Sequence, residues 1–178
     1  MTAATTKGLI IVNTGNGKGK TTAALGLALR AAGQGLRILI LQFMKGQKNV
    51  GEYKALGRIG LPITIRQLGR AGFVHSRACE TLDIAKAYKG LELFREALTG
   101  GEYDMIILDE INVAVSFGLL EIEDVLAAMA DRPPNVHVVL TGRNAHEKVV
   151  AMADLVTEMR EIKHPFQQHI KAQKGIEF

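Results

Sequence analysis

Short apolar segments recur along this chain, and more polar segments separate them. Six of the apolar segments have the length of β-strands, and they span residues 9–12, 38–43, 63–67, 105–109, 136–141 and 155–159. Several contain almost no polar residue, which is typical of strands buried on both faces of a parallel sheet. The pattern therefore predicts a sheet with a covered centre.

Three longer segments have helical character, and they span residues 21–32, 78–98 and 121–130. The first carries Arg30 as its only charge, so we expect this helix to be largely buried. Gly90 inside the second disfavours a helix there by about 1 kcal/mol relative to alanine. Alternating strands and helices predict an α/β fold, an open and mainly parallel sheet with helices on both faces.

In a sheet of this kind, ligands bind at the carboxyl ends of the strands. The loops that follow the first five predicted strands should therefore face one site. Residues 45–54 and 69–77 are the longer irregular stretches, and both follow predicted strands, so we expect them to be substrate loops. No repeat or linker divides the 178 residues, which are expected to form one domain.

The segment between the first strand and the first helix reads Thr-Gly-Asn-Gly-Lys-Gly-Lys-Thr-Thr from Thr14 to Thr22. Glycines in such a turn let backbone N–H groups converge on phosphate oxygens at the positive end of the new helix. Lys20 adds a charge for the phosphates, and the Thr21 hydroxyl is a ligand for Mg²⁺. The candidate nucleotide contacts are consecutive in the chain: Gly15, Asn16, Gly17, Lys18, Gly19, Lys20, Thr21 and Thr22.

The glycine spacing differs from the common pattern Gly-x-x-x-x-Gly-Lys-Ser/Thr. Thr14 takes the place of the first glycine, and glycines stand at positions 15, 17 and 19 instead. The alternative is a glycine turn that caps a helix beside a chance lysine, but the order of strand, loop and helix favours a phosphate site. The spacing leaves open how a triphosphate lies and whether its terminal phosphate reacts.

Two acids, Asp109 and Glu110, end the fourth predicted strand. In a phosphate-binding fold of this type, an acid here holds Mg²⁺ directly or through water, opposite the Thr21 hydroxyl. The spacing does not decide which of the two is the direct ligand. Arg143 follows the fifth strand and belongs to the same edge, where it either pairs with phosphate or carboxylate or is a solvated loop charge.

Composition narrows the class of protein. The net charge of +4 favours anionic ligands such as ATP but is too small and too evenly spread to demand nucleic acid. The single cysteine, Cys79, rules out an internal disulfide and suggests a reducing compartment. No apolar stretch approaches the length of about 20 residues that spans a bilayer. We therefore expect a cytoplasmic protein without a membrane partner.

Further motifs follow the glycine loop in a fixed order: Gln42-Phe43-Met44-Lys45-Gly46, Gly72-Phe73, Leu108-Asp109-Glu110, Thr141-Gly142-Arg143, Lys163-His164-Pro165-Phe166 and Lys171-Ala172-Gln173-Lys174-Gly175-Ile176. Together with the loop they resemble the ATP:corrinoid adenosyltransferases of the cobalamin pathway, over residues 8–178. The resemblance implies a recombinase-like P-loop fold, usually as a homodimer. It also implies transfer of the 5′-deoxyadenosyl group of MgATP to cobalt(I) of a corrinoid, with release of triphosphate.

The same resemblance implies roles for single residues. Lys20, the loop amides and Mg²⁺ (or Mn²⁺ in its place) on Thr21 with Glu110 or Asp109 would stabilise the departing triphosphate. Family members place aromatic residues after the third strand against the lower face of the corrinoid. The matching positions are Phe73 and His75, and the second is ordinarily tryptophan. A neutral imidazole is also a metal ligand, so His75 is either corrinoid-facing or an exposed loop residue.

Several points stay open at this level. The corrinoid is cobalamin, cobinamide or cobyrinic acid diamide, and the resemblance implies a reduced flavin or flavoprotein as electron donor. The segment from Lys163 onward is either a cover over the corrinoid or a surface tail. Two other functions remain as alternatives. One is a nucleic-acid-stimulated ATPase, which the low aromatic content of 5% disfavours. The other is a non-catalytic protein that binds ATP and corrinoid.

Overall fold

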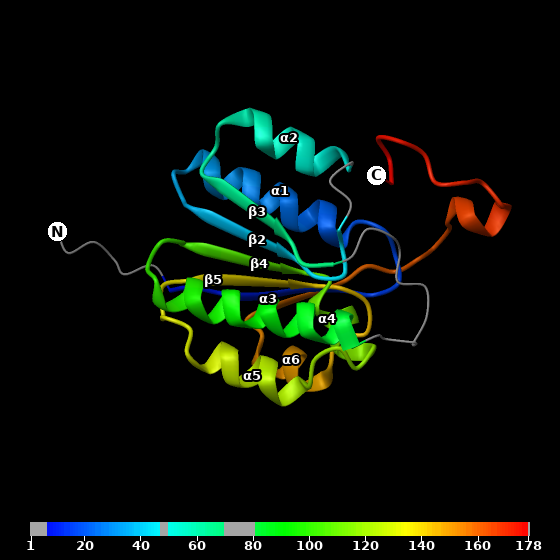
Figure 1. Ribbon diagram of the computed structural model, residues 1–178. Helices are drawn as coiled ribbons and strands as arrows, with labels where there is room; N and C mark the ends of the chain where they lie inside the picture. The colour runs from blue at the N-terminus through cyan, green and yellow to red at the C-terminus, as the bar shows by residue number, and fades with distance from the viewer. Residues whose placement is uncertain (1–6, 47–49, 70–80, 178) are drawn as a thin grey trace.

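The computed structural model describes residues 7–46, 50–69 and 81–177 (Figure 1). Its sheet has six strands in the order β3-β2-β4-β5-β1-β6, and every neighbouring pair is parallel. The strands are β1 (Ile10–Thr14), β2 (Ile38–Gln42), β3 (Ile63–Gln67), β4 (Met105–Asp109), β5 (His137–Thr141) and β6 (Leu155–Glu158). The predicted α/β fold with a parallel sheet is confirmed, and each strand lies within two residues of its expected bounds.

Helices cover both faces of the sheet. The α-helices of the described residues are α1 (Lys20–Gly33), α2 (Gly51–Ile59), α3 (Thr81–Thr99), α4 (Ile111–Ser116), α5 (Ile122–Ala130) and α6 (Glu147–Met152). A short 3-10 helix, η1 (Pro165–Gln168), lies in the C-terminal segment. Figure 1 shows α1 and α2 above the sheet and α3, α4, α5 and α6 below it. None of the described helices is long and apolar enough to cross a membrane.

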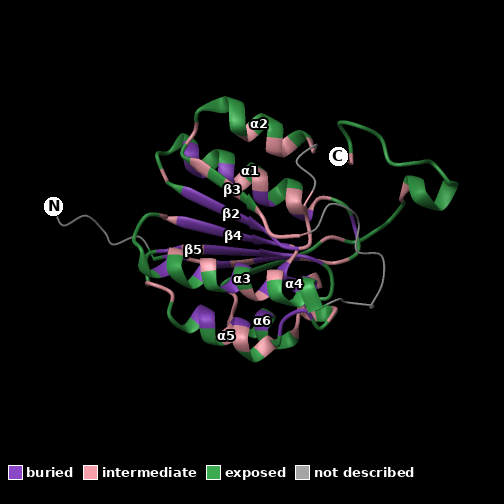
Figure 2. Ribbon diagram, in the orientation of Figure 1, coloured by how far each residue is buried: buried purple, intermediate pink, exposed green. Residues whose placement is uncertain are grey.

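The centre of the sheet is buried because β2 and β4 are apolar on both faces. Every residue of these two strands is buried, and Figure 2 shows the same central band. Alternate residues of the strands point into two separate apolar clusters. Leu39, Ile106 and Val138 pack towards α3 and α5, whereas Ile40, Ile107 and Val139 pack against alanines of α1. Because successive side chains of a strand point to opposite faces of the sheet, the same strands pack against both layers of helices.

One expectation about burial was wrong. The helix α1 buries one face, through Ala24, Ala28, Ala31 and Ala32, but Leu29 on its other side is 52% exposed. The low charge of α1 did not predict full burial, because α1 lies on the outside of the sheet and buries only the face that packs against it. The strand β6 is exposed at every position, because it is the edge strand beside β1.

Helices also occur where the sequence suggested irregular chain. The α2 helix begins at Gly51, inside the stretch 45–54 that was expected to be a loop.

Gly90 lies within α3 and is buried. A Cβ there would stand 2.6 Å from Leu68 Cδ1 and 2.8 Å from the Phe43 ring. The lack of a side chain at Gly90 is therefore a packing requirement that outweighs helix propensity.

The carboxyl ends of the strands carry unusual backbone conformations. Met44 after β2, Glu110 after β4 and Asn144 after β5 have φ values of 59°, 66° and 56°. Left-handed conformations are uncommon for residues other than glycine, and such strain clusters at functional sites. All three residues line one cleft, described next.

Candidate active site

The glycine loop joins β1 to α1 and leaves the start of the helix open. Gly19 precedes α1 with φ 121°, a conformation that favours glycine, and no side chain caps the helix. The first N–H groups of a helix have no partner within the helix, so an uncapped N-terminus presents donors and a partial positive charge to an anion. The loop thus has the conformation that phosphate binding requires.

The loop lies against the chain that follows β6. The Gly17 N–H donates to the Met159 carbonyl at 2.7 Å. A Cβ at Gly17 would stand 2.7 Å from the Arg160 carbonyl oxygen, so no side chain fits at this position. The second glycine of the motif is therefore required by close backbone packing, and β6 contributes to the shape of the loop.

Lys20 is buried at the first position of α1, and its ammonium points back into the loop. Its Nζ donates to the carbonyls of Gly15 and Gly17, each at 2.7 Å. Burial and the positive charge of Arg143 lower the pKa of Lys20, and the charges of Glu110 and Glu161 oppose that shift. The cation is therefore held at the point where loop, helix and cleft meet.

Asp109 ends β4 at the centre of a polar cluster and is 1% exposed. Its Oδ1 accepts from the Thr21 hydroxyl at 2.8 Å and from the Thr141 hydroxyl at 2.7 Å. Its Oδ2 accepts from Lys45 Nζ at 2.8 Å and from Gln42 Nε2 at 3.1 Å. The start of α1 and the ends of β2 and β5 therefore converge on one carboxylate.

Asp109 and Lys45 each favour the charged form of the other. Burial raises the pKa of Asp109, but the charge of Lys45 and the hydrogen bonds from Lys45, Thr141 and Thr21 outweigh it, so the pKa lies below its ordinary value. Burial lowers the pKa of Lys45, but the charge of Asp109 and the bond to it outweigh that too, and the pKa is raised. Both groups are charged at neutral pH.

Glu110 takes a different position from its neighbour. Its backbone N–H donates to the Thr141 hydroxyl at 2.9 Å, and its left-handed conformation turns the residue out of the strand. Burial and the negative charge of Asp109 raise the pKa of the Glu110 carboxyl, with Lys45, Lys20 and Arg143 opposing. Asp109 is locked in the sheet, whereas Glu110 lines the cleft.

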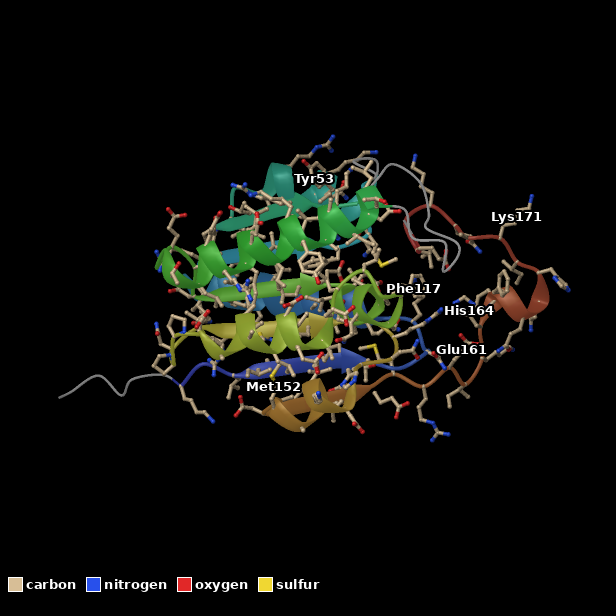
Figure 3. The ribbon with its side chains drawn as sticks, turned by 60° about the horizontal axis from the view of Figure 1, so that its bottom comes forward. Tyr53, Phe117, Met152, Glu161, His164 and Lys171 are labelled. Carbon is tan, nitrogen blue, oxygen red and sulfur yellow. The ribbon has the colours of Figure 1, made fainter. Side chains whose placement is uncertain are left out.

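The cleft at this edge of the sheet has a volume of about 850 Å³, within the range of small-molecule sites. Both polar and apolar side chains line it. The polar lining includes Lys18, Lys20, Thr21, Lys45, Glu110 and Arg143, and the apolar lining includes Leu25, Met44, Val113, Phe117 and Ile176. In Figure 3, Phe117, which follows α4, lies at the same end of the molecule as Glu161 and His164.

The structure brings most of the predicted site residues together. Lys18, Gly19, Lys20, Thr21, Thr22, Glu110 and Arg143 all line the cleft. Asn16 is exposed, and its carbonyl accepts a long hydrogen bond, 3.5 Å, from Arg143 Nη2. Arg143 is therefore exposed and in contact with the loop at once. Phe73 and His75 lie outside the described residues.

Lys45, Gln42 and Thr141 were not selected from the sequence as site residues. A signal for them was available, because all three stand at the carboxyl ends of predicted strands, where ligands bind. The C-terminal segment also reaches this site, since Gly175, Ile176 and Glu177 line the cleft. Its chain therefore approaches the nucleotide loop rather than leaving the domain surface as a free tail.

The described residues include no group of three or more His, Cys, Asp or Glu that could form a metal site by itself. Mg²⁺ seldom needs one, because it keeps several waters and takes one or two carboxylates together with substrate phosphates. The Thr21 hydroxyl and Asp109 carboxylate lie 2.8 Å apart at the mouth of the loop, with Glu110 beside them. This set of oxygen donors fits Mg²⁺ that arrives with a nucleotide.

A parallel sheet in this order, with a glycine loop between β1 and α1 and an acid at the end of β4, defines the P-loop class of α/β proteins. The family model of ATP:corrinoid adenosyltransferase BtuR/CobO/CobP matches residues 6–178. The chain belongs to this family. It is an enzyme that transfers the adenosyl group of ATP to the cobalt of a corrinoid, a step of cobalamin biosynthesis.

Individual relatives agree with the family match. A corrinoid adenosyltransferase of Sinorhizobium is 42% identical over 97% of this chain and 81% of its own length. Those of Pseudomonas aeruginosa and Escherichia coli are 39% and 37% identical, with 97% of this chain and 84% and 86% of theirs covered. A KaiC-like protein from Pyrococcus horikoshii matches in structure, with a TM-score of 0.57 at 15% identity over 88% of this chain and 74% of that one. This last likeness supports the recombinase-like fold.

Proposed function

We propose that the glycine loop binds the triphosphate of ATP as a leaving group and that C5′ of the ribose is the reacting carbon. The observation that carries this proposal is that Lys20, Lys45 and Arg143 line one cleft together with apolar side chains of Leu25, Val113 and Phe117. Cations and loop amides suit the triphosphate. The apolar side chains suit a flat macrocycle or a purine.

The reaction balances without a nucleophile from the protein. Cobalt(I) of the reduced corrinoid donates an electron pair to C5′, the cobalt–carbon bond forms, and the C5′–O5′ bond breaks. The electron pair of that bond leaves with the triphosphate. The work left to this chain is to position C5′ over cobalt and to stabilise the charge on the departing oxygens. We assign the second task to Lys20, whose ammonium lies in the loop, and to the first amides of α1, which no side chain caps.

We assign the proposed metal site to Thr21, Asp109 and Glu110, for Mg²⁺ or Mn²⁺. When bound, the ion would supply further positive charge to the triphosphate. Asp109 holds the Thr21 hydroxyl in place by accepting a hydrogen bond from it, and Glu110 is the acid that faces the cleft. Glu110 is therefore the better candidate for a direct ligand, and Asp109 for the residue that orients Thr21.

The remaining features of the proposal rest on the family. We expect Phe73 and His75 to face the corrinoid and Gly15, Asn16, Gly17, Lys18, Gly19 and Thr22 to contact ATP. We further propose that residues 1–178 act as one catalytic domain, as a cytoplasmic homodimer that a reduced flavin or flavoprotein supplies with electrons. No nucleic acid or membrane takes part in this scheme.

The test is turnover with MgATP and a chemically reduced corrinoid. The expected products are an alkylated corrinoid, followed by its absorption spectrum, and triphosphate in equal amount. Lys20→Met should lower kcat/KM by about 100-fold or more, the usual effect of losing one charge-stabilising donor. Lys148→Met removes a surface lysine paired with Glu123 and is the matched control. ADP formed in step with turnover would reject the proposal, and stimulation of that ADP release by single-stranded DNA would favour a nucleic-acid-dependent ATPase instead.

A further inference from the structure

Lys45 occupies a defined place between the two elements of the candidate metal site. Its Nζ lies 2.8 Å from Asp109 Oδ2 and 3.2 Å from the Thr21 hydroxyl oxygen. These are the two oxygen donors from β4 and α1 that face each other across the loop. Lys45 is therefore the cation that holds them in the described structure.

The backbone around Lys45 is built for this position. Met44, with φ 59°, turns the chain back at the end of β2. The Gly69 N–H donates to the Lys45 carbonyl at 2.8 Å, and a Cβ on Gly69 would overlap the backbone of residues 44 and 45. The two loops after β2 and β3 are thus packed backbone to backbone. The side chain of Lys45 is 29% exposed, so its ammonium reaches the buried carboxylate from the cleft side.

The same oxygen lone pairs serve either an ammonium or a divalent cation. An ammonium at 2.8 Å from Oδ2 engages the charge of Asp109, and its bond to Thr21 engages the hydroxyl oxygen that a metal would take. A divalent cation that enters without a nucleotide must displace Lys45 and gains few protein ligands in exchange. A triphosphate changes both conditions, because it brings metal ligands and offers the ammonium new anionic partners in the cleft that Lys45 lines.

We propose that Lys45 is a resident counter-cation of Asp109 that makes capture of the divalent cation depend on the nucleotide. The inference rests on the proposed MgATP site and assigns it an order of binding. Without a triphosphate, Lys45 neutralises Asp109 and blocks Thr21. With a triphosphate, Lys45 turns to the phosphate oxygens and frees both groups. Lys20 has no such role, because its ammonium is bound by the carbonyls of Gly15 and Gly17.

The test measures Mn²⁺ binding to the full chain by electron paramagnetic resonance, first without nucleotide and then with ATP, and without corrinoid in either case. Wild type should bind Mn²⁺ weakly alone and much more tightly with ATP. Lys45→Met should bind Mn²⁺ alone at least about 10-fold more tightly than wild type, since a competing unit charge has been removed from a partly buried oxygen cluster. Lys148→Met removes another lysine paired with a carboxylate, at 2.6 Å, and should leave Mn²⁺ binding unchanged.

Lys45→Gln covers the case in which Lys45→Met fails to fold. Its amide can still donate to Asp109 and Thr21, but it carries no charge, so it too should bind Mn²⁺ alone at least about 10-fold more tightly. Affinity for Mn²⁺ alone that matches wild type in the folded variants would overturn the inference. A wild type that gains no affinity for Mn²⁺ with ATP would overturn it as well. The proposed function fails separately, if wild type forms no alkylated corrinoid, and tighter Mn²⁺ binding by both variants together with the gain of wild type in ATP would then still support the role of Lys45.

Discussion

The clearest physical test of the site is the replacement Asp109→Asn, which keeps the shape of the side chain and removes its charge. The carboxylate accepts four hydrogen bonds, two on each oxygen. An amide has one oxygen, and that oxygen can still accept the hydrogen bonds from Lys45 and Gln42. Its NH₂ group must then face the hydroxyls of Thr21 and Thr141.

Both hydroxyls lose an acceptor in that arrangement. The Thr141 oxygen already accepts from the Glu110 N–H, and its residue is 0% exposed, so its hydrogen has no new partner. An unsatisfied buried donor costs about 1–3 kcal/mol. Lys45 also loses its counter-charge, but it is partly exposed and can turn to water, which lowers the cost of breaking the pair below the usual range of about 3–5 kcal/mol.

We therefore expect Asp109→Asn to lower the free energy of unfolding by about 3 kcal/mol. For a domain of this size each kcal/mol shifts Tm by about 2–4 °C, so Tm should fall by about 6–12 °C. The measurement is urea and thermal unfolding in the absence of nucleotide and Mg²⁺. Asp131→Asn makes the same chemical change at an exposed residue after α5 and is the control.

An unchanged or higher Tm for Asp109→Asn would refute the reasoning. It would mean that the desolvation of the buried carboxylate outweighs its four hydrogen bonds and the Lys45 charge. The control separates this result from a general effect of removing an acid from a chain whose net charge is +4.

Three further outcomes are expected. Gly17→Ala should destabilise the fold and weaken ATP binding in calorimetry, since its Cβ would stand 2.7 Å from a backbone oxygen. Gly90→Ala should lower the free energy of unfolding by about 1–3 kcal/mol through overpacking, whereas Gly26→Ala, with no atom within 4 Å of its Cβ, should raise it by about 0.4–1 kcal/mol. Asp104→Asn should cost about 1 kcal/mol at neutral pH, because the Arg37 hydrogen bond lowers the pKa of this partly exposed acid. A lowered pKa stabilises the folded state above the unfolded pKa of about 3.9, so urea titrations should show this difference vanish as the pH falls below about 4.

The strands were predictable because burial on both faces leaves a simple local signal. The strand β4 is apolar from Met105 to Leu108 and pairs with two strands, so its pattern and its surroundings agree. The edge strand β6 was found from its short apolar run at Leu155 and Val156, although all of its residues are exposed, since an edge position depends on strand order and not on local sequence. The helices α2, α4 and α6 were missed, the last two because six residues carry little periodicity and α2 because it begins inside a stretch, 45–54, that was expected to be irregular.

The residues of the site also fall into two groups, those that a local motif predicts and those whose role depends on strand order. The glycine loop and the two acids are local motifs, and the structure places the loop and Glu110 at the cleft, with Asp109 buried at the end of β4. The role of Lys45 is not local, since its partner Asp109 lies 64 residues away on the neighbouring strand. It also depends on the left-handed turn at Met44, a conformation that a methionine in the sequence does not predict. Motifs with a fixed spacing are readable in one sequence, whereas charge pairs formed by strand order are not.

Lys20 and Lys45 are already bound inside the protein, the first by two loop carbonyls and the second by Asp109 and Thr21. A triphosphate that enters this cleft therefore exchanges partners with the protein and does not simply neutralise free cations. When Lys20 turns to the phosphates, the two loop carbonyls become free. When Lys45 does so, the Asp109 carboxylate and the Thr21 hydroxyl become free. Because a single phosphate group cannot replace both sets of contacts, the arrangement should discriminate strongly between a triphosphate and a nucleoside monophosphate. The cations thus favour the ligand that matches the departing group in the adenosyl transfer.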